Sequence, residues 1–333
     1  MTRVVRRLWK IVLLAILLFM GFYTAAEFYK IYPAPVSLRY TQPLAKTQVE
    51  HALDYAADKK NTSGSYPTFW LEQNGGQVTT PYAQVSARIL VGLGEGALIL
   101  PARFIRGGWP GVYDEYGCAV STQLAWQLWG STDVLGKEVG YNKRKLLVRG
   151  VFEGEEPLLY ATGGTDAGYT CVELTPLQGS DKRQAAGNFC AEAGLPTPEH
   201  MVYAGSMNFL MQVACWAAVI ALALGLLVRL VLACPPSKRR WMMLALLFAA
   251  AVLLPLGLSA LPGWLIPTRW SDFAFWGKLW HTVGERIEEW LTLPALFKDV
   301  MAKWLLFKQG LICVGLLLVT VSIGKNRTQY YKR

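Results

Sequence analysis

Long runs without a charged residue dominate the pattern of hydrophobic and polar positions. Two of the four runs exceed, and two approach, the roughly 20 apolar residues that a helix needs to cross a bilayer. The four runs are Ile11 to Ala26, Met201 to Val228, Trp241 to Thr268 and Gln309 to Gly324. We expect Pro255 and Pro262 to kink or shorten the third, and the fourth reaches full length only with Trp304 to Phe307. The pattern predicts four transmembrane helices.

Between the first two runs the periodicity is that of a soluble domain. Apolar residues recur at helical spacing from Leu44 to Lys59, and they alternate with polar residues from Gln84 to Val91. Further expected elements are a hairpin of Tyr66 to Leu71 and Gln77 to Thr80 around Asn74-Gly75-Gly76, a loop over Arg106 to Tyr116, a strand from Tyr169 to Leu174, and a helix from Ser180 to Gly194. Strands and helices interleave, which indicates an α+β domain.

Several local signals agree in the stretch from Cys118 to Phe152. Its Cys-Ala-Val start has strand character, and Ser121 can cap a helix that Gly130 ends. Gly136 breaks the chain again. The segments Glu138 to Tyr141 and Lys145 to Glu153 then flank a polar turn. The stretch predicts strand, helix and hairpin in that order.

The resulting fold class is a membrane protein with four transmembrane α-helices and an extracytoplasmic α+β domain inserted between the first and second helices. The expected divisions are a first transmembrane helix over 1–29, the domain over 30–203, transmembrane helices over 204–233, 241–265 and 304–325, and an outer loop over 266–303.

Charge distribution sets the expected orientation. The chain has 333 residues, is 53% hydrophobic and carries a formal net charge of +10. The excess positive charge lies beside the apolar runs, in segments that contain no acid, and the rest of the chain is about neutral. These basic residues are Arg3, Arg6, Arg7, Lys10, Arg229, Lys238, Arg239, Arg240, Lys325, Arg327, Lys332 and Arg333. By the positive-inside rule both termini and the 234–240 loop are cytoplasmic, in a multi-pass protein of a bacterial inner or plasma membrane. No basic face remains on the large domain, so nucleic acid is not an expected partner.

Two other segments near the membrane have alternative interpretations. Thr24-Ala25-Ala26 could end a cleaved signal peptide, but the apolar run continues past it, which favours an uncleaved anchor.

In the outer loop, apolar and aromatic residues from Phe273 to Leu291 recur at helical spacing opposite Lys278 and other charged residues. This amphipathic helix is expected to contact membrane lipid at the outer interface, and the alternative is packing beneath the soluble domain.

The sequence offers few candidate catalytic or metal-binding motifs. His51, His200 and His281 are far apart in sequence, and the chain contains neither a phosphate-binding loop nor a nucleophile motif. We therefore expect no enzyme activity in this chain, no cofactor and no metal. Among the cysteines outside the cytoplasm, Cys171 on a strand is expected to form a disulfide with Cys190 on the following helix. The alternative is that these thiols are buried and reduced.

The same stretch contains a pattern of three short runs: one ending in Leu128-Trp129-Gly130, then Val134-Leu135-Gly136-Lys137-Glu138-Val139, then Leu147-Val148-Arg149-Gly150-Val151-Phe152. This pattern resembles the MacB-type periplasmic core domain of MacB/FtsX-like ABC transporter permeases. In that resemblance Gly130, Gly136 and Gly150 are fold markers that suit turns or close backbone approach. The order of one span, a large outer domain and further spans is similar too. The resemblance implies a homodimer, or a heterodimer with a related permease, that couples a separate cytoplasmic ABC ATPase to the outer domain.

In this interpretation Lys238, Arg239 and Arg240 face the ATPase. The chain departs from the family in its seven-residue loop from Cys234 to Arg240, in having no elbow helix before Trp9, and in its long outer loop. A second hypothesis is therefore a non-transporting, membrane-anchored binding or scaffold protein that retains the domain.

Overall fold

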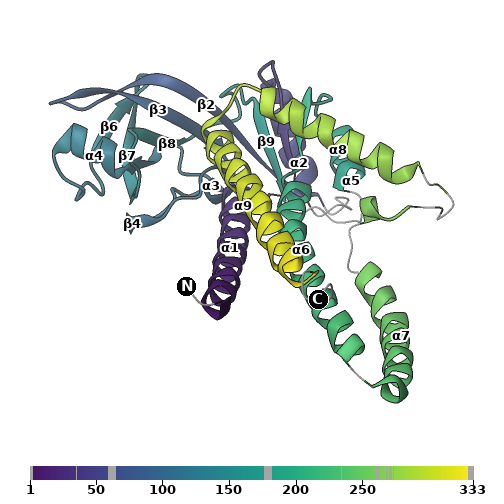
Figure 1. Ribbon diagram of the computed structural model, residues 1–333. Coiled ribbons are helices and arrows are strands. Elements are labelled where there is room, and N and C mark those ends of the chain that lie inside the picture. The colour runs from purple at the N-terminus through teal and green to yellow at the C-terminus, as the bar shows by residue number, and fades with distance from the viewer. Residues whose placement is uncertain are drawn as a thin grey trace. The chain divides into compact units, whose positions relative to one another are not determined.

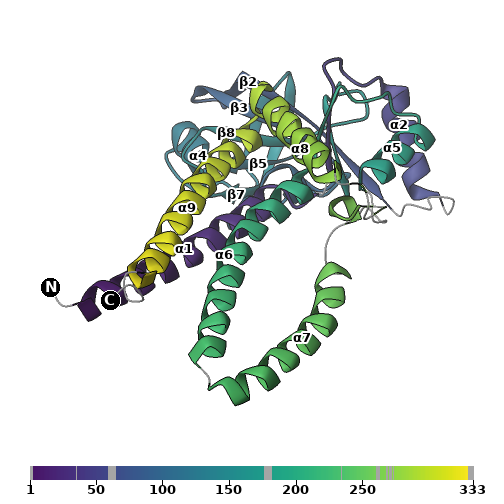
Figure 2. The ribbon, with the colours of Figure 1, turned by 45° about the vertical axis from the view of Figure 1, so that its right-hand side comes forward.

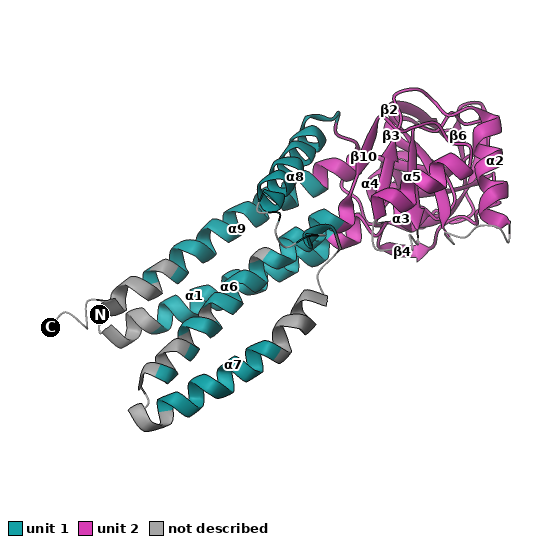
Figure 3. Ribbon diagram, turned by 90° about the vertical axis from the view of Figure 1, so that its right-hand side faces the viewer, with its two compact units in different colours: residues 1–28, 206–294, 302–333 teal, residues 29–205, 295–301 magenta. Residues whose placement is uncertain are grey.

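The computed structural model describes residues 3–34, 36–58, 65–175, 182–233, 235–259, 263–267, 269, 272 and 274–328. The chain divides into two compact units, coloured separately in Figure 3. We call residues 29–205 with 295–301 the sheet unit, and residues 1–28, 206–294 and 302–333 the helix unit. The short piece 295–301 is notable because the sequence places it in the outer loop.

A ten-stranded mixed sheet forms the sheet unit (Figure 1). The path runs β10-β1-β9-β2-β3-β8-β5-β7-β4, with β6 pairing with β2 and β7. Two neighbouring pairs, β3 with β8 and β5 with β7, are parallel, and the others are antiparallel. The strands are β1 (Val36–Arg39), β2 (Tyr66–Thr79), β3 (Gln84–Leu93), β4 (Phe104–Gly107), β5 (Gly117–Ser121), β6 (Glu138–Tyr141), β7 (Arg144–Phe152), β8 (Leu158–Thr162), β9 (Cys171–Thr175) and β10 (His200–Val202).

Alternation along the strands gives the sheet two apolar faces. One face packs against α2 (Lys46–Ala57), α4 (Thr122–Trp129) and α5 (Lys182–Glu192). Among these helices, α2 and α5 lie side by side in Figures 1 and 2, joined by the edge-to-face contact of the Tyr55 and Phe189 rings. The opposite face packs against α3 (Gly96–Ile99) and against Leu296 and Phe297 of the short C-terminal piece.

The strand, helix and hairpin predicted from Cys118 to Phe152 are confirmed as β5, α4, β6 and β7. Ser121 Oγ accepts a hydrogen bond from the Leu124 amide at 3.2 Å, as an N-cap does. Gly130 ends the helix at φ +65°. The element boundaries agree because capping and turn residues, whose local chemistry is strong, mark each of them.

The predicted hairpin around Asn74-Gly75-Gly76 is wrong. Residues 66–79 form one long strand, β2, which pairs with β3 through a register shift between Gln73 and Gly76. Gly75 at φ +72° absorbs the extra residue as a bulge. A glycine pair inside a strand pattern fits a bulge as well as a turn, and pairing with β3 decides between them. The start of the helix predicted from Ser180 to Gly194 lies outside the described residues.

Within the described residues, three helices are long and apolar enough to cross a membrane, with candidate spans Leu8–Ile31, Ala204–Gly225 and Phe297–Thr320. They belong to α1 (Arg3–Ile31), α6 (Ala204–Ala233) and α9 (Phe297–Thr328). The helix α7 (Pro236–Ser259) is formed, and a fourth span over it stays a prediction. Met201 and Val202, which the sequence places in the second apolar run, lie in β10 instead because their backbone pairs with β1.

Within the helix unit, α1, α6 and α9 run together (Figure 3). Leu14 of α1 packs with Ile312 and Leu316 of α9. Lys10 Nζ donates hydrogen bonds to Ser322 Oγ at 2.6 Å and to its carbonyl at 3.2 Å. The unit also contains α8 (Phe275–Thr292), which covers most of the predicted amphipathic helix and has Trp276 and Trp280 exposed.

Candidate functional site

Strand alternation places an unusual set of polar side chains on one face of the sheet. In β1, Val36 and Leu38 point into the core cluster that packs against α2, α4 and α5, so Ser37 and Arg39 point to the other face. In β9, Glu173 stands opposite Ser37, and Cys171 stands opposite Arg39. These side chains meet at the face covered by the C-terminal piece 295–301.

Glu173 is at the centre of this set, and its side chain has no exposed surface. Its Oε1 accepts hydrogen bonds from Ser37 Oγ at 2.8 Å and from Trp70 Nε1 at 3.1 Å. The same oxygen lies 3.0 Å from Lys298 Nζ. A buried carboxylate needs such compensation, because removing it from water without partners costs several kcal/mol.

Lys298 and Asp299 come from the first turn of α9. Lys298 Nζ also donates to the Leu98 carbonyl at 2.7 Å and lies 4.4 Å from the centre of the Tyr32 ring. Asp299 Oδ1 accepts from the Tyr32 hydroxyl and lies 3.5 Å from Arg39 Nη2. Its Oδ2 reaches back to accept from the amide of Leu296, the residue before the helix, at 3.2 Å. The first turn of α9 therefore supplies two of the charged residues that meet here, and Arg39 and Glu173 supply the other two.

Two cations and two anions balance in the cluster. Exposed fractions are 8% for Arg39, 0% for Glu173, 1% for Lys298 and 4% for Asp299. Burial acts to lower the pKa of Arg39, but the anionic and polar groups around it outweigh burial and raise that pKa. Burial raises the pKa of Tyr32, so its neutral hydroxyl donates to Asp299. We call Arg39, Glu173, Lys298 and Asp299 the charge cluster.

Not every polar atom of the charge cluster has a partner. Among the described residues, Arg39 Nε and Nη1 and Glu173 Oε2 form no hydrogen bond. Each cation lies in the electrostatic field of both carboxylates. An exchange of partners, Arg39 to Glu173 and Lys298 to Asp299, would keep the charges balanced.

A second set of contacts holds the same piece of chain. Glu72 Oε2 accepts from the Phe297 amide at 2.7 Å, and Glu72 Oε1 pairs with Arg88 Nη1 at 2.7 Å. The Arg88 guanidinium lies 5.2 Å from the centre of the Phe297 ring. Residues 295–301 are thus fixed to β2 and β3 as well as to β1 and β9.

The charge cluster is formed by, or lies next to, the chain segments that continue into the candidate spans. Tyr32 directly follows α1, and Lys298 and Asp299 begin α9. β1, which carries Arg39, pairs with β10, and β10 precedes α6 with Arg39 opposite His200. These buried charges cannot separate without losing their compensation.

The helix unit has a polar cluster of its own. Gln309 of α9 is 3% exposed; its Oε1 accepts from Thr24 of α1, and its Nε2 donates to the Met211 carbonyl of α6 at 2.9 Å. Gln309 Nε2 also lies 3.3 Å from Cys215 Sγ. A Cβ on Gly21 would lie 2.5 Å from that sulfur, so the close approach requires glycine. Polar side chains buried between apolar helices join them by hydrogen bonds that lipid cannot supply.

The sequence-predicted site residues fall elsewhere. Residues 236–240 belong to the first turns of α7, so the predicted cytoplasmic loop is a helix start; Arg240 is exposed, and the side chain of Lys238 is not described. Gly130 and Gly136 lie at positive φ. A Cβ on Gly150 would lie 2.3 Å from the Gly108 carbonyl oxygen.

The predicted Cys171–Cys190 disulfide is not formed. Both thiols are free and buried, and they belong to core clusters on opposite faces of the sheet. The strand that carries Cys171 points it away from α5, which carries Cys190, because β9 alternates. Among the described residues, no group of three or more His, Cys, Asp or Glu side chains is placed to hold a metal ion.

Sequence reasoning missed the charge cluster. The sequence carries only a weak signal for it: each of two short strands contains one charged residue, Arg39 at the end of VSLR and Glu173 in the middle of CVELT. Both positions share a strand face with a polar or small neighbour. Their partners begin a helix much later in the chain, and one sequence gives no measure of that proximity.

Comparisons with known proteins give structural similarities only. No family model matches the chain, and no curated protein matches it. The periplasmic region of MacB from Actinobacillus actinomycetemcomitans is similar over 53% of this chain and 91% of that one, with 12% identity and a TM-score of 0.40. The extracellular domain of the noncanonic ABC-type transporter YknZ from Gram-positive bacteria is similar over 49% and 96%, with 13% identity and a TM-score of 0.37.

Proposed function

We propose that the chain is a permease-type membrane subunit that transmits the state of a separate cytoplasmic ABC ATPase to an extracytoplasmic sheet unit. The observation that carries the proposal is the charge cluster, which holds the first turn of α9 and the residue after α1 against β1 and β9. In this proposal the sheet unit lies outside the cytoplasm, and both termini and the α6–α7 connection lie inside it. The chain acts as a dimer, with itself or with a related permease.

The charge cluster supports transmission for an energetic reason. A buried pair that loses one partner costs about 3–5 kcal/mol, so the start of α9 moves together with the sheet rather than separately. A change in the membrane helices then either displaces the sheet or exchanges the partners within the cluster. Both outcomes alter the sheet unit from a distant site, which is what coupling between two sites requires.

The alternative is a membrane-anchored binding or scaffold protein that is not driven by ATP. The observation that favours it is the α6–α7 connection. Only residues 234 and 235 separate the two helices, which leaves little chain to present to an ATPase. In that case the charge cluster serves to fix the sheet unit rigidly to its anchors.

Co-purification tests the proposal. An ATP-binding-cassette ATPase should be recovered with the tagged chain in detergent. It should be lost when Lys238, Arg239 and Arg240 are replaced together by alanine. A matched control replaces Arg103, Lys143 and Lys145, basic residues of the sheet unit, by alanine and should keep the ATPase. Failure of the wild-type chain to recover any such ATPase would leave the scaffold function.

We further propose that α8 contacts membrane lipid at the outer interface. Trp276 and Trp280 are 41% and 55% exposed, and Lys278 and Glu285 lie among the polar residues of the helix. Quenchers attached to lipid acyl chains should reduce the fluorescence of the wild-type chain more than that of a Trp276→Phe/Trp280→Phe variant. Equal quenching of the two would reject the interfacial position.

A further inference from the structure

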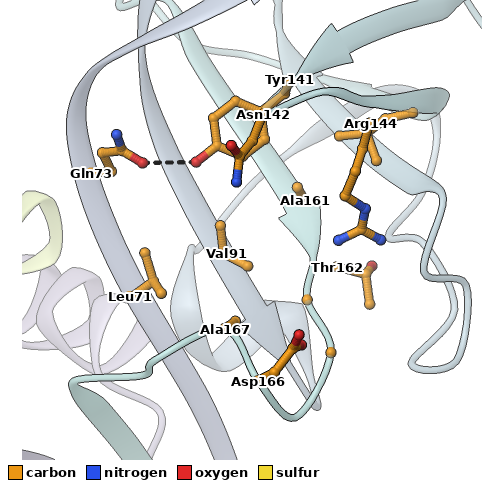
Figure 4. Close-up of a pocket in the computed structure, with 13 residues that line it drawn as sticks. Leu71, Gln73, Val91, Tyr141, Asn142, Arg144, Ala161, Thr162, Asp166 and Ala167 are labelled. Carbon is orange, nitrogen blue, oxygen red and sulfur yellow. Dashed lines mark hydrogen bonds between the residues drawn. The ribbon is translucent and has the colours of Figure 1, made fainter. Parts of the chain in front are cut away.

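The sheet unit contains a pocket that is separate from the charge cluster and that the proposed function does not use. Its volume is about 340 Å³, within the range of small-molecule sites. It lies where β2 and β3, the β6–β7 turn and the loop after β8 come together (Figure 4). Leu71, Val91 and Ala161 give it an apolar wall.

Two opposite charges line this pocket. Arg144 begins β7, and its guanidinium donates to the Glu115 carbonyl and lies 5.9 Å from the centre of the Tyr116 ring. Asp166 comes from the loop after β8 (Figure 4). Across the described chain neither side chain forms an ion pair, and Asp166 also forms no hydrogen bond. Each charge is therefore available to a ligand.

The loop that carries Asp166 is built for close approach. A Cβ on Gly163 would lie 2.5 Å from the Tyr169 hydroxyl oxygen and 2.6 Å from Val91, and a Cβ on Gly164 would lie 2.9 Å from Asp166 Oδ1. The Tyr169 hydroxyl fixes the loop by donating to the Gly164 carbonyl at 2.9 Å. The crowding at Gly163 favours glycine there, where the chain passes close to Val91 and Tyr169.

The other side of the pocket is fixed as well. The Tyr141 hydroxyl donates to Gln73 Oε1 at 2.8 Å, which joins the β6–β7 hairpin to β2 (Figure 4). Tyr141 and Arg144 are the paired residues on either side of the two-residue turn. The position of Arg144 therefore follows from a short hairpin whose side wall is hydrogen-bonded to the sheet.

We propose that this pocket binds a small zwitterion of the α-amino acid or dipeptide class. Arg144 would bind its carboxylate, Asp166 would bind its ammonium group, and a small apolar side chain would lie against Leu71 and Val91. A guanidinium recognises a carboxylate through charge-assisted hydrogen bonds, and a carboxylate does the same for an ammonium group. The site does not depend on ATPase coupling.

Equilibrium dialysis of the full chain in detergent against labelled L-alanyl-L-alanine tests the site. Saturable binding is expected below about 10 mM, a range typical of weak small-molecule sites. N-acetylation of the dipeptide, or amidation of its carboxylate, should each weaken binding at least about tenfold, the effect of losing about 1.4 kcal/mol. These blocked probes need no change in the protein, so folding defects cannot imitate their effect.

Two variants assign the ends of the ligand. Asp166→Asn should remove the preference for the free amine, and Arg144→Gln should remove the preference for the free carboxylate. Arg106→Gln and Asp133→Asn alter an exposed ion pair of the same unit and should leave binding unchanged. The proposal is overturned if the dipeptide shows no saturable binding, if blocked dipeptides bind equally well, or if both pocket variants keep wild-type preferences.

Discussion

Lys298 Nζ lies 3.0 Å from Glu173 Oε1, and neither side chain has more than 1% of its surface exposed. Lys298 lies in the first turn of α9 and Glu173 in the middle of β9, so this ion pair joins two segments that are far apart in the sequence. The pair is completed by Arg39 and Asp299, and together the four residues make the start of α9 part of the sheet unit.

Removing one charge from this pair should be far more costly than removing both. Lys298→Met or Glu173→Gln alone leaves a buried charge without its partner, at about 3–5 kcal/mol. For a unit of this size we expect the unfolding temperature in detergent to fall by about 6–20 °C. The double variant should unfold no lower than either single variant, because neither charge is then left alone.

An exposed pair provides the control for that experiment. Lys145 and Glu138 lie 3.5 Å apart with exposed fractions of 83% and 61%. Lys145→Met should change stability by less than about 1 kcal/mol. Additive losses in the buried double variant would show that the two charges do not compensate each other.

The polar cluster of the helix unit should depend on Gln309 and on the small residue facing it. Gln309→Leu removes hydrogen bonds that join three helices, at about 0.6–2 kcal/mol. Gly21→Val forces a side chain onto Cys215 Sγ and should lower the thermal stability of the detergent-solubilised chain further. Gly310→Val is the matched control, since a Cβ at Gly310 has no neighbour within 4 Å among the described residues. Equal melting of Gly21→Val and Gly310→Val would contradict this packing.

The thiols of the sheet unit should be reduced and unreactive. Burial raises the pKa of Cys190 to about 11 and that of Cys118 to about 12, so at pH 8 the reactive thiolate is about one part in a thousand or less. Maleimide should label neither residue until the chain is denatured, whereas an exposed Tyr113→Cys thiol should react at once. Peptide mapping without reductant should find Cys171 and Cys190 unpaired. A peptide containing both in a disulfide would contradict the structure.

Local chemistry made part of this fold predictable. Ser121, Gly130 and Gly136 set the ends of α4 and its following turn, and signals of this kind act within a few residues. Gly75 and Gly76 could not be assigned from the sequence, because a glycine pair suits a turn as well as a bulge. The pairing of β2 with β3 shows that they form a bulge. The charge cluster could not be predicted from the sequence, because the partners of Arg39 and Glu173 are residues 298 and 299, more than 100 residues away along the chain.

The proposed topology has its own test in single-cysteine labelling. A membrane-impermeant thiol reagent applied from outside should reach Lys60→Cys and miss Pro236→Cys, because the basic residues near 238–240 retain the α6–α7 connection in the cytoplasm. Permeabilised cells should label both positions. The reverse pattern would exclude the orientation.

The proposed function requires the charge cluster to pass a change in the membrane helices to the sheet unit. Pulsed electron paramagnetic resonance can test this by measuring the distance between two spin labels, one at Tyr113 of the sheet unit and one at Trp241 of α7, both well exposed. The labels are attached without cysteine chemistry, so the native thiols do not interfere. It is measured with the partner ATPase, without nucleotide and with ATP in a hydrolysis-deficient ATPase. We expect the distance distribution to shift with ATP in the wild-type chain and to stay unchanged in the folded Lys298→Met/Glu173→Gln variant. No shift in the wild type, or the same shift in the variant, would contradict transmission through the cluster.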